Sequence, residues 1–138
     1  MRFEGRVRKD KGSKYWLIEV PLLNVMTQGT SKQNAHEMIA DAIEMLVNRK
    51  GFRVNVRPDA GSTFTVGANQ ENILFALMLK RQREAHNLTL LEMARRLHSK
   101  SPNAYARYEQ GKSVPTLDKL NQLMQAIDPR FEPILKAG

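Results

Sequence analysis

Strand-like alternation of apolar and polar residues is confined to the first half of the chain and gives way to helical spacing after residue 72. Phe3 and Val7, for example, alternate with charged residues, as in a half-buried strand. Strands are predicted over 1–8, 15–20, 25–28, 52–57 and 63–66, and helices over 31–46, 73–85, 90–97, 102–110 and 117–127. This order predicts an α+β chain of two small domains, residues 1–68 and 69–138, with a polar linker over 67–72.

Composition excludes several classes of site. The chain has no cysteine, so disulfides, thiolate zinc sites and cysteine nucleophiles are ruled out. His36, His86 and His98 lie far apart and show no ligand spacing, so neither a metal nor another cofactor is expected. No segment approaches the roughly 20 apolar residues of a membrane span. The first residues lack the apolar stretch of a secretory signal, and we therefore expect a cytoplasmic protein without membrane contact.

The charge balance is basic. Twenty-two Lys and Arg oppose 14 Asp and Glu, which gives a net charge of +8 and a sequence pI near 10.0. Such a balance is compatible with a nucleic-acid partner. Each half of the chain holds 11 basic and seven acidic residues, so net charge by halves does not locate the binding surface.

The most informative segment spans residues 89–112. Thr89 and Glu92 form a capping box, in which the Thr89 hydroxyl accepts from the third N–H and Glu92 reaches back to the cap N–H. The buried stripe of this first helix is predicted to be Leu90, Met93, Ala94 and Leu97.

A second helix is predicted to start at Ser101-Pro102, with Ser101 as the cap, and to end at Gly111. The spacing of Tyr105 and Tyr108 directs them inward. The outward face then carries polar or small residues, among them Asn103, Ala106 and Arg107.

These residues resemble the Xre/Cro-type helix-turn-helix of phage-repressor-like proteins. The landmarks are Leu79, Arg83, Leu88-Thr89, Glu92, Ala94, Leu97, the run from Arg107 to Lys112, and Pro115-Thr116-Leu117. The sequence departs from the family at the turn after Leu97, which is a residue longer than usual and has His98 where glycine is customary. The resemblance implies an all-α domain that binds double-stranded operator DNA as a homodimer or a higher even oligomer.

The same resemblance assigns roles to individual side chains. Asn103 would offer its amide to adenine, and Arg107 its guanidinium to guanine or phosphate, with Ala106 on the same face. Phosphate contacts, which position the protein without reading sequence, would come from Thr89, Lys100, Ser101 and Lys112.

The first 67 residues resemble the HicB antitoxin domain. The resemblance is carried by the segment from Pro21 to Thr30, with its Gln28-Gly29-x-x connection, and by a following helix that contains Ala35 and Ala42-Ile43. It implies a partial ribonuclease-H-like sheet with a helix. It also implies an antitoxin that binds a HicA-like, mRNA-cleaving toxin and represses its own operon. Asn24 stands where this family often has glycine.

The sequence bears on two other functions, a ribonuclease and a stand-alone regulator. A ribonuclease site of this type needs carboxylates that converge on metal ions, but the predicted strands offer only Glu4 and Glu19. Glu37, Asp41 and Glu44 are spaced as a solvated helix face, so we do not expect an enzyme. A stand-alone transcription regulator, whose first domain dimerises or binds a ligand, remains open as the alternative.

Overall fold

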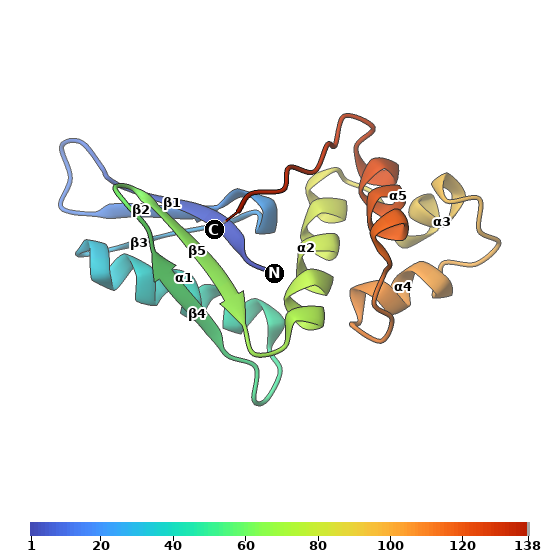
Figure 1. Ribbon diagram of the computed structural model, residues 1–138, viewed down its shortest axis with the longest axis horizontal. Helices are drawn as coiled ribbons and strands as arrows, with labels where there is room; N and C mark the ends of the chain where they lie inside the picture. The colour runs from blue at the N-terminus through green and yellow to red at the C-terminus, as the bar shows by residue number, and fades with distance from the viewer. Residues whose placement is uncertain (138) are drawn as a thin grey trace. The chain divides into compact units, whose positions relative to one another are not determined.

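The computed structural model describes residues 1–137 of the chain (Figure 1). The chain divides into two compact units, Met1–Met78 and Leu79–Gly138, which are treated separately below. The first unit is a five-stranded antiparallel sheet with a helix, and the second is helical. The α+β class predicted from the hydrophobic periods is therefore confirmed.

The sheet of the first unit has the strand order β3-β2-β1-β5-β4, and every neighbouring pair is antiparallel. Alternating side chains point to opposite faces. One face is apolar and buried, with Val7 beside Ile18 and Phe3 beside Val66. The other face is open to solvent and carries the exposed side chains of Glu4, Arg6 and Arg8 on β1. The strands are β1 (Phe3–Lys9), β2 (Trp16–Val20), β3 (Val25–Gly29), β4 (Val54–Pro58) and β5 (Thr63–Ala68).

Helix α1 (Lys32–Val47) covers the apolar face of the sheet (Figure 1). It begins at Ser31, whose Oγ accepts a 3.0 Å hydrogen bond from the Asn34 N–H. Its buried face consists of Ala35, Ile39 and Ile43. Helical spacing from Ala35 alone would place Met38 and Leu46 on the buried face, but they are 38% and 43% exposed, whereas Ile43 is fully buried.

A short 3₁₀ helix, η1 (Pro21–Leu23), joins β2 to β3 and is followed by Asn24 in the left-handed conformation, with φ of 51°. Asparagine is among the few residues other than glycine that adopt this conformation readily. Asn24 therefore makes this left-handed turn without a glycine.

The predicted linker over residues 67–72 is wrong. Gly67 and Ala68 belong to β5 and pair with β4. The Asn69 side chain accepts from the Arg53 N–H at 2.8 Å and donates to the Gly51 carbonyl at 2.8 Å. Helix α2 (Glu71–Ala85) starts two residues later and runs through the boundary between the units, which lies ten residues beyond the predicted one. Polar residues that resemble a linker here satisfy backbone groups instead.

The second unit contains the C-terminal part of α2, then α3 (Leu90–Arg96), α4 (Asn103–Glu109) and α5 (Leu117–Ile127). All four helices were predicted, with ends that differ by at most two residues. Their core consists of Leu79, Leu88, Met93, Ala94, Tyr105, Leu123, Met124 and Ile127. Among residues 1–137, no helix combines the length and apolar character needed to cross a membrane.

Candidate nucleic-acid interface

Helix α3 begins at Thr89 through a side-chain cap. The Thr89 Oγ1 accepts a 3.1 Å hydrogen bond from the Glu92 N–H, as predicted. The other half of the predicted capping box differs, because the Glu92 carboxylate accepts from the Thr89 hydroxyl at 3.2 Å. Of the predicted buried stripe, Met93 and Ala94 are fully buried, whereas Leu90 is 36% exposed.

The helices α2, α3 and α4 all end in the same type of turn. Asn87, His98 and Gly111 each adopt a left-handed conformation, with φ of 55°, 56° and 72°. In each case the N–H of the next residue donates to the carbonyl oxygen five positions earlier. The N···O distances are 3.1 Å for Leu88, 2.8 Å for Ser99 and 3.0 Å for Lys112. This is the Schellman motif, which satisfies the free carbonyls at a helix end. It fixes the direction in which the chain leaves each helix.

His98 therefore adopts a left-handed conformation at the position where the resemblance leads one to expect glycine. Histidine is one of the residues that tolerate left-handed φ better than most. The turn after α3 is thus made without a glycine.

Helix α4 begins one residue later than predicted. Pro102 is the residue before the first helical position and Asn103 is the first. Ser101 still acts on the helix start, because its Oγ accepts from the Asn103 N–H at 3.2 Å. Proline in this place removes a donor that the helix leaves unpaired in any case.

The exposed face of α4 carries the predicted base-reading residues. Asn103 and Arg107 are exposed and four positions apart, so they lie one above the other, and Ala106 is half-buried beside them. The Arg107 Nε donates a long 3.4 Å hydrogen bond to Ser113 Oγ. Tyr105 is buried, which confirms its predicted inward position, and Tyr108 is half-buried.

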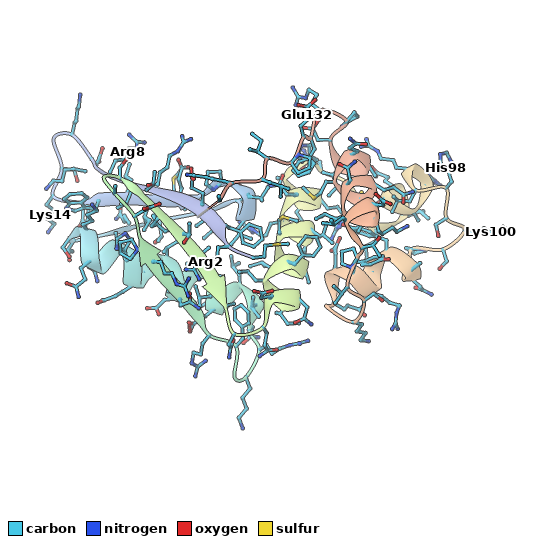
Figure 2. All side chains as sticks on the ribbon, viewed as in Figure 1. Arg2, Arg8, Lys14, His98, Lys100 and Glu132 are labelled. Atoms are coloured by element: carbon cyan, nitrogen blue, oxygen red, sulfur yellow. The ribbon has the colours of Figure 1, made fainter. Side chains whose placement is uncertain are left out.

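The predicted phosphate contacts come from three places. Lys100 is exposed at the outer end of the loop between α3 and α4 (Figure 2), and Ser101 follows it directly before α4. Thr89 caps α3, where its hydroxyl is already engaged by Glu92. Lys112 is exposed just after α4. The structure thus brings Lys100 and Ser101 to the start of α4, next to Asn103.

A partly buried ion pair holds α4 against α2. The Arg83 Nε and Nη2 donate to the two Glu109 carboxylate oxygens at 2.7 and 3.0 Å, and Nη1 donates to the Leu88 carbonyl at 2.7 Å. The two side chains are only 13% and 7% exposed. Hydrogen bonding to the Glu109 carboxylate raises the pKa of Arg83 despite its burial. Both residues belong to the sequence landmarks of the helix-turn-helix resemblance, but no local pattern predicts that they pair.

The Tyr105 hydroxyl is buried close to this ion pair. Burial, first, and then the negative charge of Glu109 raise the pKa of Tyr105. Within residues 1–137, no group lies at the distance and angle of a hydrogen bond to this hydroxyl. Tyr105 therefore fills the core as a neutral ring beside the Arg83–Glu109 pair.

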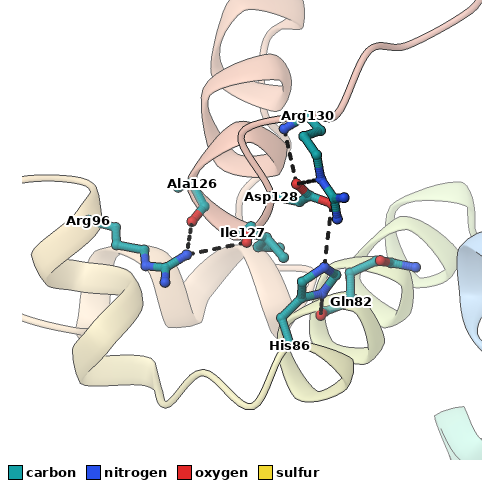
Figure 3. A network of polar contacts seen from close by, with 7 residues as sticks. All are labelled: Gln82, His86, Arg96, Ala126, Ile127, Asp128 and Arg130. Carbon is teal, nitrogen blue, oxygen red and sulfur yellow. Dashed lines mark hydrogen bonds and ion pairs between the residues drawn. The ribbon is translucent and has the colours of Figure 1, made fainter.

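A second polar network closes the C-terminal end of α5 (Figure 3). The Arg96 Nη1 donates to the Ala126 carbonyl at 2.8 Å and to the Ile127 carbonyl at 3.3 Å. Asp128 accepts from Arg130 and lies 3.6 Å from His86 Nε2. Hydrogen bonds from Arg130 are the main cause that lowers the pKa of Asp128. This network ties α3 and the end of α2 to α5.

Residues 79–128 match the family described as helix-turn-helix. This segment is a DNA-binding domain of the Xre/Cro type. The helix-turn-helix domain accounts for the capped α3, the Schellman turns and the polar outer face of α4, and it makes the chain a DNA-binding transcription regulator. No curated protein and no solved structure matches the chain.

Proposed function

We propose that the protein represses transcription by reading operator DNA with the outer face of α4. The observation that carries this proposal is the exposed pair Asn103 and Arg107 on α4, inside the helix-turn-helix domain. In such domains the second helix of the motif enters the major groove with its N-terminal residues foremost. Asn103 would bond adenine and Arg107 guanine. Phosphates would be held by Thr89, Lys100, Ser101 and Lys112.

Replacing Arg107 with alanine is expected to weaken binding to the operator by about 1–3 kcal/mol and to relax the preference at one base pair. The measurement compares two duplexes, one from the region upstream of the chain's own gene and one of random sequence. Arg49→Ala, an exposed arginine of the first unit, is the control. An equal loss on both duplexes would assign Arg107 to phosphate. A wild-type protein without preference for the upstream duplex would refute the repressor proposal.

For the first unit we propose toxin capture. The proposal rests on the HicB resemblance of Pro21–Thr30 and is supported by the compactness of the unit and by the left-handed Asn24 at the family's glycine position. The protein would then be the antitoxin of a HicA-like ribonuclease. Because inhibition and repression need only binding surfaces, we propose that the chain itself catalyses no reaction. A dimer or higher even oligomer would match a palindromic operator.

Co-expression with the adjacent open reading frame tests this assignment. We expect the neighbour's product to arrest growth alone, and the full-length chain to relieve the arrest and copurify with it. The double variant Asn103→Ala, Arg107→Ala should still neutralise the toxin while losing operator binding. If the neighbour is not toxic and does not copurify, the chain is a stand-alone regulator whose first unit dimerises or binds a ligand.

A further inference from the structure

The turn of the hairpin formed by β1 and β2 is strongly basic. Residues 6–14 carry five cationic side chains and one carboxylate, Asp10. Their net charge of +4 is matched in the first unit by residues 49–57, which hold four cationic side chains and no carboxylate but do not form a hairpin. All five cations are exposed: Arg6, Arg8, Lys9, Lys11 and Lys14. Figure 2 shows Arg8 and Lys14 near the hairpin's outer end.

The backbone of the hairpin is well ordered by its hydrogen bonds. Lys9 pairs with Trp16 across the two strands, and the Asp10 N–H donates to the Tyr15 carbonyl at 2.9 Å. Gly12 has φ of 77°, as the tight turn requires. The basic side chains are therefore presented on a two-stranded ribbon.

The cations are placed on both sides of this ribbon. Arg6 and Arg8 alternate along β1 and share the open face of the sheet, about 7 Å apart along the strand. Lys9 points to the opposite side, with its Nζ 5.9 Å from the centre of the Trp16 ring. Within residues 1–137, Arg6, Arg8 and Lys11 form no ion pair. Charge is thus available on both sides and at the turn.

We propose that the β1–β2 hairpin is a second DNA contact that binds the phosphate backbone beyond the base pairs read by α4. A two-stranded ribbon fits a groove of duplex DNA, where phosphates flank it on both sides, whereas an acidic protein surface would engage one face. This inference rests on the proposed repressor function. It assigns to the first unit a non-specific, salt-sensitive share of the affinity.

The first experiment measures binding of the full-length protein to a labelled 40-base-pair random-sequence duplex at several salt concentrations. The variant Arg8→Gln, Lys11→Gln removes two exposed charges from the hairpin and leaves Lys9 and Lys14 in place. The matched control, Arg49→Gln, Lys50→Gln, removes two exposed charges between α1 and β4. Because each lost phosphate contact lowers the slope of log K against log salt by about 0.9, the hairpin variant should lose about 2 from the slope. The control should lose none.

The second experiment uses Trp16, the only tryptophan in the chain, which lies beneath Lys9. Duplex DNA should change its emission in the wild type and in Arg107→Ala, since that variant lacks only the contact of α4. In one contrary outcome, the wild type binds DNA while Trp16 emission stays unchanged and the two double variants give equal salt slopes. This result would leave the repressor proposal standing and would overturn the proposed hairpin contact. A Trp16 response to 40-nucleotide single-stranded RNA but not to duplex DNA would also overturn it. A wild type that binds no duplex at all would refute the repressor proposal itself.

Discussion

Replacing Glu109 with glutamine is expected to destabilise the helix-turn-helix domain by about 3–5 kcal/mol. The substitution keeps the shape of the side chain but removes the charge that faces Arg83 across two short hydrogen bonds. The two side chains are only 13% and 7% exposed, so Arg83 would be left as a largely shielded charge without a counter-ion. Unfolding in urea, followed by far-ultraviolet circular dichroism, measures the loss.

Two further variants make this result specific. Glu84→Gln neutralises an exposed carboxylate next to Arg83 and should change the free energy of unfolding by less than about 0.5 kcal/mol. Replacing both partners, Arg83→Met with Glu109→Leu, should recover much of the loss, because no unpaired charge remains. If Glu109→Gln cost no more than Glu84→Gln, the ion pair would not support the position of α4.

Local features of the DNA-binding half could be predicted because short segments determine them. The Thr89 cap depends on two residues three positions apart. The left-handed turn after α4 depends on one residue, Gly111. The inward position of Tyr105 follows from helical spacing alone. By contrast, the Arg83–Glu109 pair joins residues 26 positions apart, and no local pattern shows that two such charges meet in the core.

The errors in the first unit have a related cause. Residues 67–72 have the composition of a linker, and only the pairing of Gly67 with Asn55 shows that the strand continues. Likewise, the charge count by halves concealed the basic hairpin, since its excess is offset by acids elsewhere in the same half. A count over nine-residue windows gives the same net charge of +4 for residues 6–14 and for residues 49–57. Only the pairing of β1 with β2 shows that residues 6–14 lie at the end of a two-stranded ribbon.

Replacing Gly29 with alanine is expected to destabilise the first unit by about 3 kcal/mol. Gly29 ends β3 directly beneath the first turn of α1, and a β-carbon there would lie 2.6 Å from the Ala35 Cα and 2.9 Å from the Asn34 carbonyl carbon. These are backbone atoms of a helix capped by Ser31, so α1 as a whole would have to move away from the sheet. The glycine at position 29 thus has a steric reason, independent of any partner.

Trp16 is the cross-strand neighbour of Gly29, so its emission during urea unfolding reports on this part of the sheet. Gly67→Ala is the matched control, because a β-carbon at Gly67 meets the guanidinium of Arg2 and not backbone. Its cost should be smaller than that of Gly29→Ala, since a shift of Arg2 weakens only its side-chain hydrogen bonds to Asn55 and Thr65, each worth about 1 kcal/mol, and moves no helix. If Gly29→Ala proved as mild as Gly67→Ala, α1 would be free to shift on the sheet. The close approach of β3 and α1 would then not be what fixes the helix.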